Sequence, residues 1–205
     1  MPPSAHQPVA SVRDFVGAAR FREAMARLAG GVSIVACLDR GEPRGLLVSS
    51  LTSLSTDPPR LLFCVRQLAS THDPLLRADR CSLSVLTEDD VDEAERFSRP
   101  DPAGARFTTP GWRIPEGGPP RFDSALISVC GSISRRIDAG SHSIFILDVE
   151  AVESRDAGPL VYFDRGYAAV DRLGFPRIRP PASRPDQSPA RRPARRRAAG
   201  VAPPR

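Results

Sequence analysis

The chain has 205 residues, of which 40% are apolar and 26% charged, values typical of one globular domain with a sizeable core. No apolar run approaches the roughly 20 residues of a membrane-spanning helix. The opening residues, MPPSAHQPVASVRD, lack a signal-peptide pattern, so we expect a cytoplasmic protein. All 29 positive charges are arginines, which excludes chemistry that depends on a lysine.

The formal charge of +5 is carried by the C-terminal end of the chain. Residues 177–205 hold nine arginines and one acid, Asp186, and their net charge of +8 leaves about −3 on residues 1–176. This segment is rich in Arg, Pro and Ala and has few large apolar residues, so it cannot bury enough surface to fold. We therefore expect disordered ends at 1–10 and 177–205 around one domain, 11–176.

The first predicted element is a helix over residues 11–28. Ser11 and Asp14 have the spacing of a capping box. Four apolar residues then recur at helical spacing on one face: Ala18, Phe21, Met25 and Leu28. The pair Gly30-Gly31 ends the helix.

Strand candidates follow, separated by short turn-like links. They are 32–38 (VSIVACL), a hydroxyl-rich run within 45–56, 60–65 (RLLFCV), 81–86 (CSLSVL), 125–137, 143–153 and 159–163. Short helices are expected at 72–79 and 88–98, the second capped by Thr87 with Asp90. Six or seven strands with few helices and no strand–helix alternation favour a closed or nearly closed antiparallel barrel over a doubly wound sheet.

The Gly- and Pro-rich residues 99–121, which include the only tryptophan, Trp112, are predicted to form one long loop. No dinucleotide fingerprint, P-loop or G-x-S-x-G elbow is present. No nucleophile motif precedes any of the three histidines, so we expect no hydrolase triad. The four cysteines lie singly in apolar runs, which favours buried free thiols over a disulfide, a metal site or a redox pair.

The segment 49–56 is unusually polar for a chain between two core strands. It contains six hydroxyl side chains: Ser49, Ser50, Thr52, Ser53, Ser55 and Thr56. Hydroxyls and amides at strand ends suit a phosphate or a planar, hydrogen-bonding heterocycle. An exposed face or a set of caps would explain the composition equally well.

Five stretches, in order along residues 18–170, resemble the flavin reductase family, the small reductase components of two-component flavin monooxygenases. They are FREAMARLAGGVSIV, GLLVSSLTSLSTDPPRLLFCV, RFTTPGW, AGSHSIFILDVEAV and PLVYFDRGYAAV. Within this family, the stretches resemble the reductase that serves 4-hydroxyphenylacetate hydroxylase. The resemblance implies an FMN-binding split β-barrel, mainly β, antiparallel and Greek-key-like, with flanking helices.

The resemblance also implies a binding site. Its flavin-lining stretch would comprise Val48, Ser49, Ser50, Thr52, Ser53, Leu54 and Ser55, while Leu51 and Leu54 also serve the core on the other face. His142 matches the family's Gly-x-His, whose imidazole lies near the nicotinamide and the flavin, and we expect it to position the nicotinamide. Ser33, Arg165 and Tyr167 match positions near the same two rings, although each could be structural.

The sequence departs from the family after residue 65. There the segment RQLAS places Arg66 and Leu68 where a polar run with Asn and Ser is common, and it keeps only Ser70. Arg66 could pair with a phosphate through two parallel hydrogen bonds. This departure leaves both FMN and FAD open as the flavin. We expect no metal ligand set.

The implied activity is NAD(P)H-dependent flavin reduction. Hydride would pass from NADH or NADPH to FMN or FAD, and the reduced flavin would leave for a separate oxygenase. The resemblance further implies a homodimer with the flavin near the subunit interface. Two alternatives on the same barrel are a flavin-binding or flavin-sensing protein without catalysis and an oxidase similar to pyridoxamine phosphate oxidase. A nucleic-acid-binding module would rest on the arginine tail alone, and the acidic body disfavours it.

Overall fold

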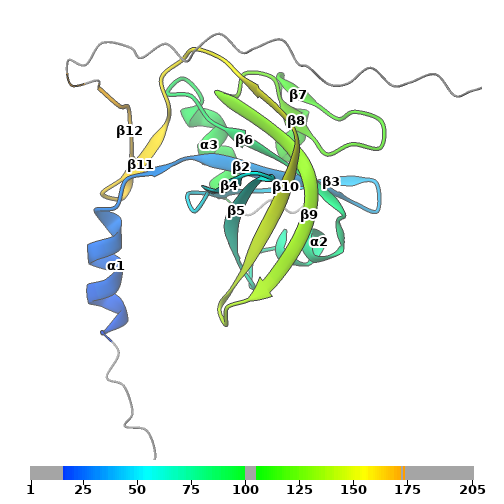
Figure 1. The fold of residues 1–205 in the computed structure, drawn as a ribbon. Helices are drawn as coiled ribbons and strands as arrows, with labels where there is room; N and C mark the ends of the chain where they lie inside the picture. Colours follow the sequence, from blue (N-terminus) through cyan, green and yellow to red (C-terminus); the bar gives the residue numbers. More distant parts are fainter. Residues whose placement is uncertain (1–15, 100–104, 172, 174–205) are drawn as a thin grey trace, which may run out of the picture. The chain divides into compact units, whose positions relative to one another are not determined.

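The computed structural model of the protein describes residues 16–99, 105–171 and 173 (Figure 1). Most strands of this part join one antiparallel sheet of seven strands in the order β3-β2-β6-β9-β10-β5-β4. The strands are β2 (Ser33–Asp39), β3 (Glu42–Val48), β4 (Thr52–Thr56), β5 (Pro59–Arg66), β6 (Arg80–Val85), β9 (Ile127–Asp138) and β10 (His142–Ser154). The prediction of a mainly β, antiparallel fold is therefore confirmed.

The two edge strands of this sheet, β3 and β4, are consecutive in the chain and are linked only by residues 49–51. From Val48 to Thr52 such a link reaches at most about 14 Å. The sheet must therefore curve until its two edges approach each other, which makes a barrel with one open seam.

The seam divides the hydroxyl-rich stretch that the sequence predicted as a single strand. At the seam, the side chain of Ser50 takes the place of a backbone partner for Cys64. Its hydroxyl donates to the carbonyl of Cys64 (3.1 Å) and accepts from the N–H of Cys64 (3.0 Å). Leu51 packs against the barrel core, as predicted. Leu54 is 46% exposed, so its predicted core role is wrong: β4 is an edge strand with one neighbour in the sheet, and no described residue buries the Leu54 side chain.

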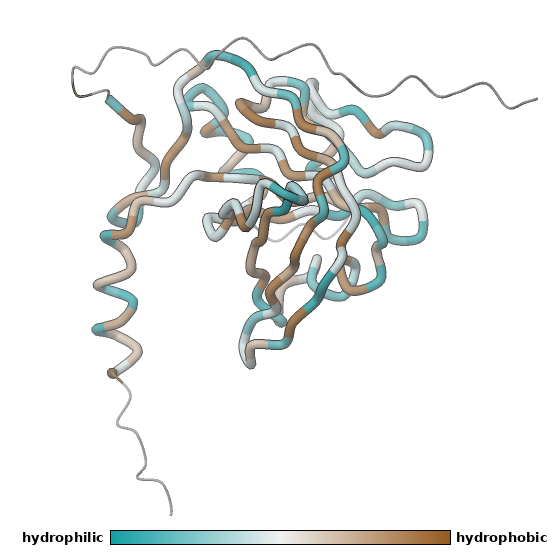
Figure 2. The backbone as a smooth tube through the Cα atoms, in the orientation of Figure 1, coloured by the Kyte–Doolittle hydropathy of each residue, from teal (hydrophilic) through white to brown (hydrophobic). Residues whose placement is uncertain are grey.

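The barrel interior follows from alternation along the strands. On β5, Leu61, Phe63 and Val65 point inward, and the ring of Phe63 stacks on that of Phe145 with centroids 5.3 Å apart. A second core cluster lies on the other face of β2, where Phe97 and Phe107 meet Trp112 and Phe122. Figure 2 shows the hydrophobic positions recurring along the strands of the barrel.

The remaining elements are short. They are α1 (Ala18–Ala26), β1 (Gly30–Gly31), α2 (His72–Arg77), α3 (Val91–Ser98), the 3-10 helix η1 (Ala105–Thr108), β7 (Trp112–Arg113), β8 (Arg121–Phe122), β11 (Val161–Phe163) and β12 (Gly166–Ala168). The prediction of one long loop over 99–121 is wrong for the described part of that segment. The indole N–H of Trp112 donates to the buried Glu93 carboxylate (2.7 Å), which fixes this region to α3.

One of the two predicted helix caps can be compared with the structure. The capping pair Ser11 and Asp14 lies outside the described residues, as do the ends 1–10 and 177–205. At the third helix, the Asp90 carboxylate accepts from both the N–H (2.8 Å) and the hydroxyl (2.6 Å) of Thr87, and the helix begins only at Val91. Within the described residues, no helix has the length and apolar character needed to span a bilayer.

The four cysteines are all free, as predicted, and three of them are buried. Burial, together with the Asp39 carboxylate, raises the pKa of the Cys37 thiol to about 12, and burial also raises the pKa of Cys81. At pH 8 only about one Cys37 thiol in 10⁴ would be the reactive thiolate.

We therefore expect a thiol reagent at pH 8 to modify the native protein at the half-buried Cys64 alone, and all four thiols after denaturation. Peptide mass spectrometry identifies the labelled sites. Cys64→Ser is the control and should abolish labelling of the native protein. Rapid native labelling of Cys37 would contradict the expectation.

Candidate functional site

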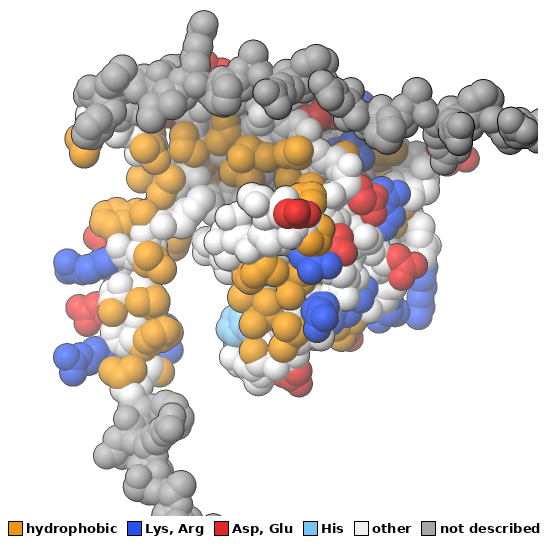
Figure 3. All heavy atoms as spheres, in the orientation of Figure 1, with side chains coloured by type: hydrophobic (Ala, Val, Ile, Leu, Met, Phe, Trp, Pro, Cys, Tyr) orange, Lys and Arg blue, Asp and Glu red, His pale blue; other side chains and the backbone are white. Residues whose placement is uncertain are grey.

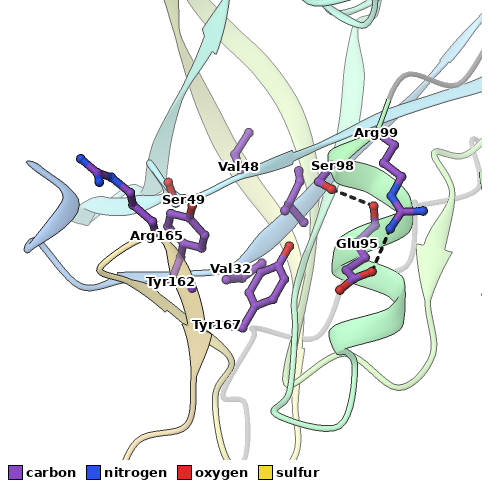
Figure 4. Close-up of a pocket in the computed structure, with 11 residues that line it drawn as sticks. Val32, Val48, Ser49, Glu95, Ser98, Arg99, Tyr162, Arg165 and Tyr167 are labelled. Carbon is purple, nitrogen blue, oxygen red and sulfur yellow. Dashed lines mark hydrogen bonds and ion pairs between the residues drawn. The ribbon is translucent and has the colours of Figure 1, made fainter. Parts of the chain in front are cut away.

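Two adjoining cavities open at the barrel seam and share Ser49, Tyr162 and Arg165. The first, of about 470 Å³, lies between the β2–β3 pair, α3 and the β11–β12 hairpin (Figure 4). The second, of about 770 Å³, lies between α1, β1 and the 49–52 segment. Both volumes are typical of cofactor or small-molecule sites.

The glycine pair after α1 allows the chain to reach the seam. A Cβ atom on Gly30 would lie 2.9 Å from the carbonyl oxygen of Ser49, closer than any side chain allows. Gly30 and Gly31 pair with Tyr162 and Val161 of β11, so the same two residues join the seam to the β11–β12 hairpin. The shape of the second cavity therefore depends on having no side chain at position 30.

The β11–β12 hairpin carries two of the three residues common to both cavities, Tyr162 and Arg165. Its turn places two non-glycine residues, Asp164 (φ 46°) and Arg165 (φ 66°), in the left-handed region, the conformation of a tight two-residue hairpin turn. Non-glycine residues rarely adopt this conformation, and such strain is concentrated at functional sites. The Asp164 N–H donates to the carbonyl of Ala26 (2.7 Å), which ties this turn to the end of α1.

Polar groups from α3 form the opposite wall of the first cavity. Arg99 pairs with Glu95 at 3.1 Å, and the hydroxyl of Ser98 donates to the Glu95 carbonyl (2.7 Å). Burial and the Glu95 carboxylate raise the pKa of Tyr167 above the ordinary phenol value, which already lies well above neutral pH. The phenol is therefore protonated and can donate a hydrogen bond. Figure 4 shows Tyr167 between α3 and Tyr162.

The donors around these cavities suit a planar, charged heterocyclic ligand. Tyr162 and Tyr167 lie directly opposite each other on β11 and β12, with ring centroids 5.8 Å apart. Arg22 and Arg165 supply guanidinium groups to the second cavity, and hydroxyls come from the 49–52 segment. Aromatic faces, arginines and hydroxyls are the groups that bind ring systems carrying phosphates.

Residues 25–171 match the family model described as flavin reductase like domain. The chain belongs to the flavin reductase family. It is 35% identical over 152 residues to a protein named FMN reductase (NADH) RutF 2 from Rhizobium rhizogenes, a match covering 73% of this chain and 87% of that protein.

Solved structures agree with this assignment. A flavin reductase domain protein from Arthrobacter sp. FB24 superposes with a TM-score of 0.70 at 25% identity, covering 77% of this chain and 98% of that one. BorF, the flavin reductase component of a bacterial two-component tryptophan halogenase, gives 0.68 at 31% identity, covering 76% and 100%. The family and fold are thereby confirmed, whereas the narrower 4-hydroxyphenylacetate type stays a prediction.

About half of the predicted flavin reductase site residues line the two cavities. They are Val48, Ser49, Ser50, Thr52, Arg165 and Tyr167. The cavities also contain residues that the sequence did not single out: Arg22, Glu95, Ser98, Arg99 and Tyr162. Two of them had a local signal, since Arg22 stands within the matched stretch FREAMARLAGGVSIV and Tyr162 within PLVYFDRGYAAV.

Arg66 and His142 line neither cavity, but they lie directly opposite each other on β5 and β10. Both are exposed on the outer face of the barrel. Ser50 bonds to Cys64, two positions before Arg66 and on the same face, so about 7 Å of strand separates them. Ser70, also exposed, follows Arg66 in the loop before α2. The predicted site residues thus continue outward from the second cavity as a strip, which consists of Ser50, Arg66, Ser70 and His142.

Four other predicted residues do not reach the cavities. Ser53 and Leu54 are exposed on β4, and the hydroxyl of Ser55 donates to the Pro58 carbonyl (2.5 Å). Ser33 is 1% exposed, and its hydroxyl has no hydrogen-bond partner among the described residues. Their roles in binding remain predictions. Within the described ranges, no three His, Cys, Asp or Glu side chains group as metal ligands would.

Proposed function

We propose that this flavin reductase transfers hydride from NADH to FMN or FAD and supplies the reduced flavin to a separate oxygenase component. The observation that carries the proposal is the convergence of the 48–52 segment, Tyr162, Arg165 and Tyr167 on two adjoining cavities at the seam. The names of the relatives support the same activity: one is an NADH-dependent FMN reductase, and one serves a two-component halogenase.

The residues present fit a flavin. The hydroxyls of Ser49 and Thr52, with backbone amides of the 49–52 segment, would hold the polar edge of the ring, and Arg165 or Arg66 would hold a phosphate. When bound, the flavin accepts the hydride and carries the redox chemistry. The protein then needs no acid or base for that step, and its residues contribute binding and alignment. His142, on the strip beside Arg66, would position the nicotinamide.

The assay that tests this proposal follows the absorbance of NADH and of NADPH, each with FMN, FAD and riboflavin in turn. We expect NADH to be oxidised when flavin is supplied or retained. A protein that binds flavin without oxidising either nucleotide would instead be the flavin-sensing alternative. Amine-dependent reduction of a tightly held FMN would indicate the oxidase similar to pyridoxamine phosphate oxidase. The four free thiols suit a reducing compartment, so we place the activity in the cytoplasm.

A second copy of the chain would complete the site. Helix α1 has no buried residue, and its predicted apolar face leaves Phe21 53% and Leu28 68% exposed. A nine-residue helix gains little stability without tertiary packing. Figure 3 shows hydrophobic side chains along α1 and on the barrel wall formed by β5 and β10. A homodimer that covers these surfaces would place a subunit interface beside the second cavity.

We expect the wild-type protein to sediment as a dimer and the variant Phe21→Glu/Met25→Glu to sediment as a monomer, because two carboxylates would be buried in the interface. Arg20→Glu introduces the same charged group on another face of α1 and should leave the dimer intact. Sedimentation velocity at several protein concentrations measures both. A wild-type monomer at micromolar concentration would contradict the dimer.

Ser49 and Ser53 offer a matched test of the flavin contacts. Ser49 lines both cavities, whereas Ser53 lines neither. A lost hydrogen bond costs about 0.5–1.5 kcal/mol, so Ser49→Val should raise the flavin dissociation constant roughly 2- to 12-fold. If the flavin binds in the cavities and not along β4, Ser53→Val should leave the constant unchanged. Titration of flavin fluorescence measures both constants, and equal effects in the two variants would remove Ser49 from the site.

A further inference from the structure

Ser143, His72 and Asp73 lie in the order of a hydrolase triad, an arrangement that the sequence did not predict. Nε2 of His72 is 2.9 Å from Oγ of Ser143, and Nδ1 is 3.3 Å from Oδ1 of Asp73. However, Ser143 is only 5% exposed and lines neither cavity at the seam. A substrate carbonyl has no path to its hydroxyl, so the trio is not a hydrolytic site and needs another explanation.

The position of the His72–Ser143 bond in the fold suggests a structural explanation for the trio. His72 begins α2 after the loop that follows Arg66 and contains Ser70, and Ser143 follows His142 on β10. The bond therefore joins the loop beside Arg66 to the strand that begins with His142. Both partners are buried, and burial of polar groups is costly unless they are paired.

Packing further restricts the imidazole of His72. The ring meets Phe145 edge-on, with centroids 6.2 Å apart and planes at 77°, and Phe145 is itself fully buried. A hydrogen bond on one side and an aromatic face on the other leave this ring little freedom. His72 is therefore a rigid point of attachment for the first residues of β10.

Two further bonds connect the same segments at the surface. The N–H of Gln67 donates to the Ser141 carbonyl (3.0 Å), and its side-chain amide donates to Asp138 (3.0 Å). The amide–carboxylate bond is exposed, where water competes for its groups. Among these links, the His72–Ser143 bond is the one between two buried side chains, and it should contribute most to fixing the β9–β10 turn.

We infer that His72 is a positioning residue for hydride transfer, which acts through Ser143 to hold His142 at a fixed place opposite Arg66. This inference rests on the proposed function and adds a residue to it. His72 itself touches no ligand. Its effect would arise because a displacement of about 1 Å in an aligning group can cost up to 10²-fold in rate.

The kinetic test compares His72→Phe, Ser143→Ala and the double variant with the wild-type protein. Each single change should lower kcat/KM for NADH about 10-fold, with the flavin dissociation constant changed less than about 2-fold. The double variant should be no worse than either single one, because both remove the same bond. His72→Gln, whose amide can occupy the position of Nε2, should recover most of the lost efficiency.

The matched control is Ser82→Ala. Ser82 is also a buried strand serine, and its hydroxyl donates to the carbonyl of Pro120 with that of Ala36 nearby (3.5 Å), away from the β9–β10 turn. This change should lower the melting temperature about as much as Ser143→Ala but leave NADH kinetics intact. Equal kinetic losses in Ser82→Ala and Ser143→Ala, or additive losses in the double variant, would overturn the inference.

Hydrogen exchange supplies a readout that needs no activity. The Ala139 N–H donates to the His142 carbonyl (2.9 Å) and closes the β9–β10 turn. Its exchange should accelerate at least about 10-fold in His72→Phe and Ser143→Ala, but not in Ser82→Ala. Unchanged exchange would overturn the inference. A wild-type protein that oxidises no NADH would instead refute the proposed function and leave this exchange result to stand by itself.

Discussion

Alanine in place of Gly131 should lower the free energy of unfolding by about 3 kcal/mol or more. A Cβ atom at this position would lie 2.1 Å from the carbonyl oxygen of Asp148, which is backbone and cannot rotate away. Gly131 pairs with Cys81 of β6 on one side and with Val149 of β10 on the other, beside a register shift in β10. Relief of the clash would therefore require a central strand to move and its hydrogen bonds to break.

Urea unfolding of the two proteins measures this loss. The control is Gly31→Ala, since Gly31 also lies in a strand and a Cβ there would meet no atom of the described chain within 4 Å. That change should alter the free energy of unfolding by less than about 1 kcal/mol. Equal effects in the two variants would show that β9 and β10 separate without cost at the register shift.

The barrel could be predicted from the sequence because its strands have local signatures. Apolar runs such as 32–38 and 60–65 stand between Gly- and Pro-rich turns, and both became central strands of the sheet. The seam could not be predicted in the same way. It depends on β3 and β4 being at opposite ends of the sheet order, which only pairing between distant segments determines. The hydroxyl-rich stretch therefore resembled one strand.

The candidate site shows the same contrast between residues with a local signature and residues that only the fold brings together. Residues within a contiguous motif, such as Ser49 and Tyr167, were identified because the motif itself carries the signal. The contribution of α3 was not, because Glu95 of this helix and Arg99, which directly follows it, are four residues apart and have the pattern of a solvated ion pair. Only when β12 packs opposite α3 do these groups face a cavity. Ser33 is the opposite case, a predicted site residue that lines neither cavity. Its strand is paired on both sides, and its hydroxyl is buried.

Removal of the imidazole in His142→Ala should lower kcat/KM for NADH roughly 5- to 150-fold, which corresponds to about 1–3 kcal/mol of transition-state stabilisation. The side chain is exposed at the first position of β10 and lies opposite Arg66, outside both cavities. Flavin contacts are expected mainly on the 48–52 segment. The flavin dissociation constant should therefore change less than about 2-fold, and the loss should appear in the use of the nicotinamide.

Ser141→Ala provides the graded control for this prediction. Oγ of Ser141 lies 2.9 Å from Nδ1 of His142, so this change removes the group that orients the imidazole but keeps the ring. If His142 aligns the nicotinamide, the efficiency of Ser141→Ala should fall between those of the wild-type protein and His142→Ala. Steady-state NADH kinetics at saturating flavin, with flavin binding measured separately by fluorescence, resolve the three proteins. Equal NADH efficiency in all three would make His142 a turn residue only, and the Gly-x-His resemblance would then carry no functional content in this chain.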